Sequence, residues 1–109
     1  MAKKRYFILS PSYDDTERMK TLREKASAYY GPKDYDEALT DPELYDKVRK
    51  ATSDSEIQNA SLLLIGITAM ALAYSDSVFV ANDWEEDDHC KFLHMLAFTH
   101  GIDIVYESV

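Results

Sequence analysis

The pattern of hydrophobic and polar positions changes along the chain, so that short β-rich runs are separated by longer stretches of helical periodicity. The first run, residues 5–9, is ended by Ser10-Pro11, because proline cannot donate to a sheet ladder. Apolar residues then recur at helical spacing over residues 17–30, where Gly31-Pro32 is a stop signal. Asp14, Asp15 and Thr16 are the candidate N-caps. The pattern therefore predicts a strand over residues 6–9 followed by a helix.

The middle of the chain predicts a loop over residues 34–40 and a short helix over residues 41–50, with Pro42 at its first position. A capping-box pattern at residues 53–56 then begins the longest helix, Ile57–Ala73. Apolar residues lie nearly all round this helix, so it must be buried on several sides. The sheet can cover one side, and a second subunit is the simplest cover for another. We therefore expect a homo-oligomer formed through Ile57–Ala73.

The last third of the chain has the order strand, polar loop, helix, strand. The strands are Ser77–Val80 and residues 102–106, the loop is residues 82–90 and the helix is residues 91–100. This order is a βαβ unit, whose right-handed crossover brings its two strands close together. The fold class predicted is α/β. We expect a small three-layer Rossmann-like (flavodoxin-like) domain with a mostly parallel sheet of three or four strands, the fourth coming from the middle of the chain.

Composition narrows the class of protein further. The length of 109 residues suits one domain, residues 1–109, with a modest core. The 12 basic and 20 acidic residues give a net charge of −8, which opposes binding to nucleic acid. The apolar run in Ile57–Ala73 is shorter than the roughly 20 residues of a membrane span and is interrupted by polar residues. Neither a signal peptide nor a transit peptide is expected, and the single cysteine fits a reducing cytoplasm.

Polar residues follow two of the predicted strands directly. In an open parallel sheet, ligands bind beyond the carboxyl ends of the strands, so these residues are expected to share one crevice. The candidate ligand-binding residues are Ser10, Ser12, Tyr13, Asn82, Asp83, Trp84 and His89.

Several of these residues also have a purely structural interpretation. Ser10 suits the turn that follows the strand, and the acids at residues 85–88 suit the first turn of a helix. Trp84 suits either a base-stacking surface or the rim of the core. Cys90 and His94 are spaced to clasp a metal from one helix face, but no second cluster of ligands accompanies them. We predict neither a metal site nor a cofactor.

Residues 5–11 and 75–108 together resemble the nucleoside 2-deoxyribosyltransferase-like superfamily, particularly its small phage- and bacteria-associated branch of unknown function. The shared pattern consists of Trp84, Glu85, Cys90, Ala97 and Gly101-Ile102. The resemblance implies a nucleoside or nucleotide-like ligand. It also implies a glutamate nucleophile, but this chain has Leu93 at the corresponding position, and a leucine cannot form a glycosyl ester.

We therefore predict a catalytically degenerate relative of these transferases that binds a nucleoside or nucleotide-like ligand without turnover and has no catalytic residue. One alternative is an acidic protein-interaction or inhibitor module, of the phage accessory type, whose charge steers it to a basic host protein. A second alternative is an N-glycosidase with relocated catalytic groups, such as Asp83 and Asp87.

Overall fold

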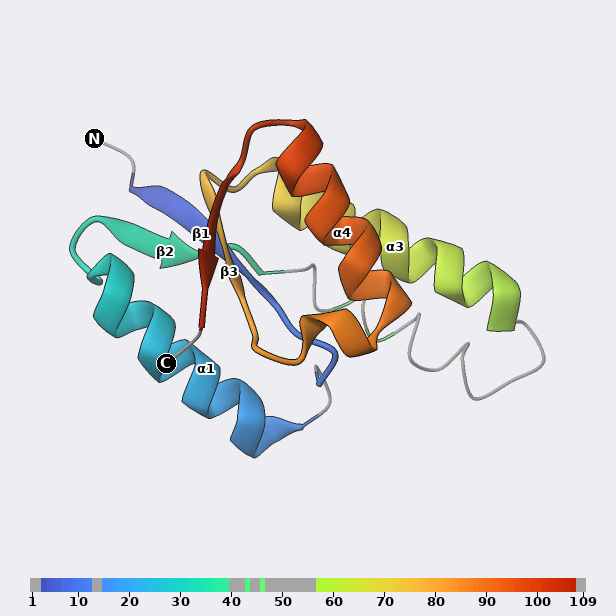
Figure 1. Cartoon of the computed structure of the whole chain (residues 1–109), viewed down its shortest axis with the longest axis horizontal. Coiled ribbons are helices and arrows are strands. Elements are labelled where there is room, and N and C mark those ends of the chain that lie inside the picture. Colours follow the sequence, from blue (N-terminus) through green and yellow to red (C-terminus); the bar gives the residue numbers. More distant parts are fainter. Residues whose placement is uncertain (1–2, 13–14, 40–42, 44–45, 47–56, 108–109) are drawn as a thin grey trace.

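The computed structural model describes residues 3–12, 15–39, 43, 46 and 57–107, apart from the side chains of residues 57–61. Strands and helices alternate along this part of the chain (Figure 1). In order, the elements are β1 (Lys4–Leu9), α1 (Thr16–Tyr30), β2 (Tyr35–Glu37), α3 (Ile57–Ala73), β3 (Ser77–Val80), the 3₁₀ helix η1 (Trp84–Glu86), α4 (Asp88–Thr99) and β4 (Asp103–Tyr106).

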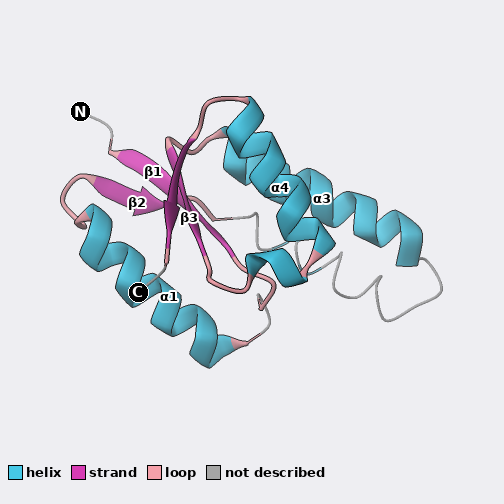
Figure 2. Cartoon of the chain, viewed as in Figure 1, coloured by secondary structure: helices cyan, strands magenta, loops and turns pink. Residues whose placement is uncertain are grey.

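The four strands form one parallel sheet in the order β2-β1-β3-β4 (Figure 2). Helix α1 covers one face, and α3 and α4 lie together on the other. The three-layer α/β class is thereby confirmed, as is the neighbouring position of β3 and β4. Leu9, Val80 and Tyr106 are in register across β1, β3 and β4, so these three strands end together at one edge.

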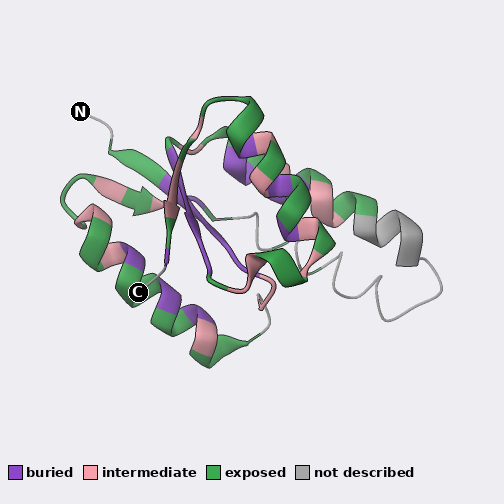
Figure 3. Ribbon diagram, viewed as in Figure 1, coloured by how far each residue is buried: buried purple, intermediate pink, exposed green. Residues whose placement is uncertain are grey.

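The central strands are apolar because both faces of the sheet are covered, as is usual for parallel sheets. Along β1, Tyr6 and Ile8 pack with the α1 side, whereas Phe7 and Leu9 pack with the α3 and α4 side. All four residues of β3 are buried as well. Figure 3 shows this buried centre between the two helical layers. The core therefore holds the carboxyl ends of β1 and β3 in fixed positions.

Helix α1 begins and ends close to the predicted positions. Of the three candidate N-caps, Asp15 is the one used, since its Oδ1 accepts the amide of Arg18 at 3.0 Å. At the other end Gly31 has a φ of +83°, which a residue with a side chain rarely adopts. The capping chemistry thus sets the length of the helix that covers one face of the sheet.

The predicted loop over residues 34–40 was wrong for three residues, because Tyr35–Glu37 form the edge strand β2. Backbone bonds flank this strand, since Lys4 donates to Asp34 O at 3.0 Å and Ala38 donates to Tyr6 O at 2.7 Å. An edge position tolerates polar side chains, so β2 has no β-rich pattern. It supplies the expected fourth strand. The capping box at residues 53–56 lies outside the described residues, and so does the predicted helix over residues 41–50 apart from residues 43 and 46.

The loop predicted over residues 82–90 is shorter than expected. Residues Trp84–Glu86 form η1, and α4 begins at Asp88 because the carboxylate of Asp87 accepts the amide of Cys90 at 3.1 Å. Helix α3 has the predicted bounds, and Ile67, Ala71 and Leu72 on it are buried. Among the helices of the described residues, none combines the length and hydrophobicity that crossing a membrane requires.

Candidate functional site

The strand order places the topological switch point of the sheet between the carboxyl ends of β1 and β3, and we call this edge the crevice. The chain leaves β1 toward α1 on one face and leaves β3 toward α4 on the other, so these neighbouring strands diverge at their carboxyl ends. Such a switch point is where open parallel sheets bind ligands. The residues that follow the three aligned strands line this edge, since Ala81 donates to Leu9 O and Glu107 donates to Val80 O.

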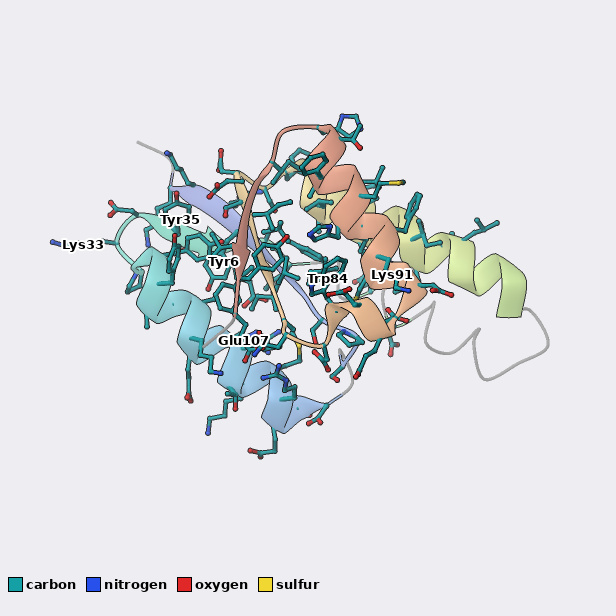
Figure 4. The ribbon with its side chains drawn as sticks, viewed as in Figure 1. Tyr6, Lys33, Tyr35, Trp84, Lys91 and Glu107 are labelled. Atoms are coloured by element: carbon teal, nitrogen blue, oxygen red, sulfur yellow. The ribbon has the colours of Figure 1, made fainter. Side chains whose placement is uncertain are left out.

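Glu107 is the most strongly bound side chain at this edge. Its carboxylate, 1% exposed, accepts bonds from Arg18 at 2.5 and 2.8 Å and from Lys25 at 2.7 Å. It also accepts the backbone amide of Asn82 at 2.9 Å. Figure 4 shows Glu107 beside α1. The carboxylate therefore joins β4, the loop after β3 and α1.

These bonds keep Glu107 ionised. The hydrogen bonds from Arg18 lower the pKa of Glu107 to about 2, outweighing the opposite effect of burial, and those from Lys25 and the Asn82 amide act in the same direction. The same contact raises the pKa of Arg18. A carboxylate held in this way is a structural anchor, because it has no proton to donate near neutral pH and its oxygens are already bonded.

Asp83 differs from Glu107, because one of its oxygens is buried but has no hydrogen-bond donor. Its Oδ1 lies 3.8 Å from Nη2 of Arg18, within ion-pair range, and accepts no hydrogen bond in the described part of the chain. The rest of the side chain reaches solvent, with 33% of its surface exposed. Leaving such an acceptor unsatisfied is costly, so a bound donor at this position would be stabilised. Asp83 therefore has unused hydrogen-bonding capacity at the crevice.

Ser10, Ser12 and Asn82 also lie at this edge. Ser10 is completely buried, and its Oγ accepts the amide of Ser12 at 3.0 Å, which closes the turn after β1. Ser12 is half-buried, whereas Asn82 is exposed. Ser12 and Asn82 therefore remain near the crevice, while Ser10 shapes the turn. Tyr13 lies outside the described residues.

Trp84 is already stacked on another ring of the same chain. Its indole lies parallel to His94, with 3.9 Å between ring centroids and 14° between planes. His94 Nε2 is 2.8 Å from the hydroxyl of Tyr106 on β4. Burial lowers the pKa of His94, so the ring is neutral near pH 7. One face of the indole is thus occupied, and Figure 4 shows Trp84 on the α4 side of the molecule.

His89 faces α3 instead of the crevice. Its Nε2 lies 3.0 Å from Oγ1 of Thr68, a buried threonine whose hydroxyl is 2.7 Å from Leu64 O. Because Thr68 donates to that carbonyl, its oxygen accepts from His89. Burial lowers the pKa of His89. The structure therefore separates this residue from the other candidates and gives it a role in joining α3 to α4.

Leu93 is fully buried between α4 and the sheet, together with Cys90 and Ala97. A side chain at this position points into the core and not toward the crevice. Burial also raises the pKa of the Cys90 thiol, which keeps it protonated. Within the described ranges, no group of three or more histidine, cysteine, aspartate or glutamate side chains is arranged to hold a metal ion.

Arg18, Lys25 and His94 were not predicted as site residues, and neither was Glu107. The position of Glu107 directly after the last strand was a usable signal, because it repeats the position of Asn82 and Asp83 near the end of β3. No local sequence pattern indicated the ion pair between Glu107 and Arg18, since 89 positions separate the two residues.

The fold and the crevice define a small, doubly wound parallel α/β protein with a polar site at the carboxyl edge of its sheet. Comparison with protein-family models, with curated proteins and with solved structures gave no match.

Proposed function

We propose that this protein binds a nucleoside in the crevice between the carboxyl ends of β1 and β3 and does not cleave it. The observation that carries the proposal is the side chain of Asp83 at the switch point of the sheet, which is 33% exposed and whose Oδ1 accepts no hydrogen bond in the described part of the chain. A sugar hydroxyl or a base amino group that contacts this carboxylate would give it a hydrogen-bond donor. The resemblance of residues 5–11 and 75–108 to the deoxyribosyltransferase-like proteins supports the same class of ligand.

The charges around the crevice favour a neutral nucleoside over a nucleotide. Arg18 is committed to Glu107 through both terminal nitrogens, so it is not available for a phosphate. The nearby acids Glu85, Glu86 and Asp88 are exposed and repel anions. We therefore expect the 5′-monophosphate of a given base to bind more weakly than the nucleoside itself.

The environments of three side chains support the proposed absence of turnover. Leu93, at the position of the family nucleophile, is apolar and buried in the core. The oxygens of Glu107 are occupied by Arg18 and Lys25. Asp87 caps α4 through its carboxylate, which disfavours its use as the partner of Asp83 in an N-glycosidase. Because none of these three side chains is available as a nucleophile or acid–base group, we expect the glycosidic bond of a bound nucleoside to stay intact.

Isothermal titration against ribo- and deoxyribonucleosides and their 5′-monophosphates tests this proposal. We expect at least one nucleoside to bind at micromolar to millimolar concentration, and Asp83→Ala to weaken it about 10-fold or more, the usual effect of losing a charged acceptor. Asp88→Ala is the matched control, since it removes an exposed acid from the same region and should leave affinity unchanged. No heat at millimolar nucleoside, or equal losses in both variants, would contradict the proposal.

Chromatography of the same mixtures tests the lack of turnover. We expect no free base after prolonged incubation with any nucleoside that binds. Release of base that Asp83→Ala abolishes would instead support the N-glycosidase alternative.

The exposed acids support a second proposal, in which the protein binds a basic protein. Glu85, Glu86 and Asp88 lie together on η1 and the start of α4 in a chain of net charge −8. Binding of this kind should weaken steeply with salt and should be reduced by the double change Glu85→Gln with Glu86→Gln. Nucleoside binding at Asp83 should survive both treatments, which separates the two functions.

A further inference from the structure

The outer surfaces of α3 and α4 expose large apolar side chains. The two helices lie side by side on one face of the sheet, with their outer surfaces turned away from it (Figures 1 and 3). We call these side chains the apolar face; with their exposed fractions they are Leu62 68%, Leu63 52%, Met70 57%, Tyr74 68%, Phe92 40%, Met95 52% and Phe98 76%.

The periodicity of each helix places these residues opposite the core. On α4, Cys90, Leu93 and Ala97 are buried against the sheet, and Met95 is about half a turn from their mean direction. On α3, Ile67 and Ala71 face inward, whereas Met70 lies on the outer side. Both helices thus have two apolar sides, of which the described fold of this chain covers one.

The apolar face is large enough for a stable contact between two proteins. Because a side chain of this size has roughly 200 Å² of surface, the exposed fractions correspond to on the order of 800 Å², about the area that each partner contributes to a standard interface. The size of this face therefore calls for a partner.

The distribution of charged residues on α3 and α4 indicates which kind of partner suits the apolar face. No acidic or basic residue occurs in Ile57–Ala73, and Asp88 and Lys91 are the charged residues of α4 apart from its histidines. The rest of this strongly acidic chain carries the net charge of −8. On the outer side of α4, the exposed Asp88 and Lys91 lie 3.8 Å apart and balance each other in charge. Two copies that meet through this face therefore bring together surfaces without net charge, whereas a basic partner would find no net negative charge there to pair with.

We propose that α3 and α4 form the interface of a homodimer, in which the apolar face of one copy packs on that of a second copy. A two-fold contact uses the same surface on both chains, so a single apolar face is sufficient. The interface does not depend on the proposed nucleoside site, which lies at the carboxyl edge of the sheet.

A pocket beside the apolar face supports the proposed homodimer interface. It has a volume of about 380 Å³ and lies between the ends of α3 and α4; its lining residues are Ala69, Leu72, Ala73, Leu96, His100 and Ile102. Ala73 precedes β3 and Ile102 precedes β4, so the pocket is at the amino edge of the sheet. An aromatic side chain of the second copy, such as Phe98, would fill a pocket of this kind and act as an anchor of the interface.

Sedimentation equilibrium of the full chain measures the assembly directly. We expect the wild type to have twice the chain mass of 12.5 kDa at micromolar concentration. Met95→Glu should raise the dimer dissociation constant at least 10-fold, because it buries a charge opposite its symmetry-related copy. Leu39→Glu is the matched control: Leu39 is 66% exposed but lies beside β2, so this variant should remain dimeric.

A second variant and a salt titration test the same interface if Met95→Glu folds poorly. Met70→Glu places the same charge on α3 and should also give monomers. Raising salt from about 50 to 500 mM should strengthen the wild-type dimer, because it screens the repulsion between two acidic chains while the apolar contact persists. A monomeric wild type, a dimer that survives both substitutions, or a dimer that dissociates in salt would each overturn the proposal.

Discussion

Glu107 connects the sheet edge to α1 more directly than any other side chain of the crevice. Two separate segments donate to its carboxylate: α1 through Arg18 and Lys25, and the loop after β3 through the amide of Asn82. A buried carboxylate is tolerated because every donor around it is positively charged or a backbone amide. This residue therefore stabilises the loop that carries Asp83 without taking part in binding itself.

Replacing Glu107 with glutamine should destabilise the protein in a pH-dependent way. The pKa of Glu107 falls from 4.5 to about 2 on folding, so the ionised group stabilises the fold above about pH 5 and loses this effect as the pH falls toward 2. At pH 7, Glu107→Gln should cost about 3 kcal/mol of unfolding free energy, narrowing to about 1 kcal/mol at pH 3. Urea unfolding at both pH values measures the difference.

Glu86→Gln, an exposed acid on η1, is the control and should change stability by less than about 0.5 kcal/mol. A cost for Glu107→Gln that is the same at pH 7 and pH 3 would contradict the assignment of an ionised, strongly paired carboxylate.

Trp84 should report the protonation of His94. It is the only tryptophan in the chain and stacks on the imidazole, and a protonated imidazole against an indole face quenches its fluorescence. Burial lowers the pKa of His94 below 6.5, so emission should decrease only as the pH falls below that value. His94→Gln should abolish this titration, whereas His89→Gln, on the α3 side of the same helix, should preserve it. An unchanged titration in His94→Gln would disprove the stack as its source.

At the scale of the elements, α4 is fixed by a narrow apolar stripe. Cys90, Leu93 and Ala97 follow one another at helical spacing and are fully buried against the sheet. Because α4 directly follows η1, its packing also sets the position of Trp84. The stripe thus links the core to the candidate site.

Leu93→Ala should cost about 2–5 kcal/mol of unfolding free energy, because it leaves a cavity in this core. Leu39→Ala makes the same chemical change at a 66% exposed position and should cost less than about 0.5 kcal/mol. Thermal or urea unfolding compares the two. Leu93→Glu should unfold the protein and should not produce a transferase. Near-equal costs for the two alanine variants would mean that Leu93 is not a core residue.

The elements with strong periodicity could be predicted from the sequence. The first strand, α1, α3 and the final βαβ unit were found because each has a buried face or a capping signal. Strand β2 was missed because its three residues are positioned by the free edge of β1, and their own side chains give no pattern. The start of α4 was misplaced because four consecutive acids were all potential caps, and the structure uses Asp87.

The candidate site could be predicted only in part, for a similar reason. Asn82, Asp83 and Trp84 were accessible to prediction because the loop after a parallel strand is a general position for ligands. The pairing of Glu107 with Arg18 and the contact of His89 with Thr68 depend on which helix covers which face. No local pattern encodes that arrangement, so these contacts could not be inferred from the sequence.

For the whole molecule, the two proposed surfaces lie on different sides: the crevice is at one edge of the sheet, and the apolar face is on the outer side of α3 and α4. The crevice with Asp83 is at the carboxyl edge, whereas the pocket between α3 and α4 is at the amino edge. Dimerisation through the apolar face would therefore leave the crevice open. We expect variants of Asp83 to remain dimeric and variants of Met95 to retain nucleoside binding.

The measurement that tests the central claim most directly is a ¹H–¹⁵N NMR titration of the full chain with nucleosides. We predict that the amide signals of Ser12, Asn82 and Asp83 shift in a saturable manner, while signals from the exposed turns of α1 stay unchanged. No shifts at millimolar nucleoside, or saturable shifts confined to residues away from the crevice, would contradict the account.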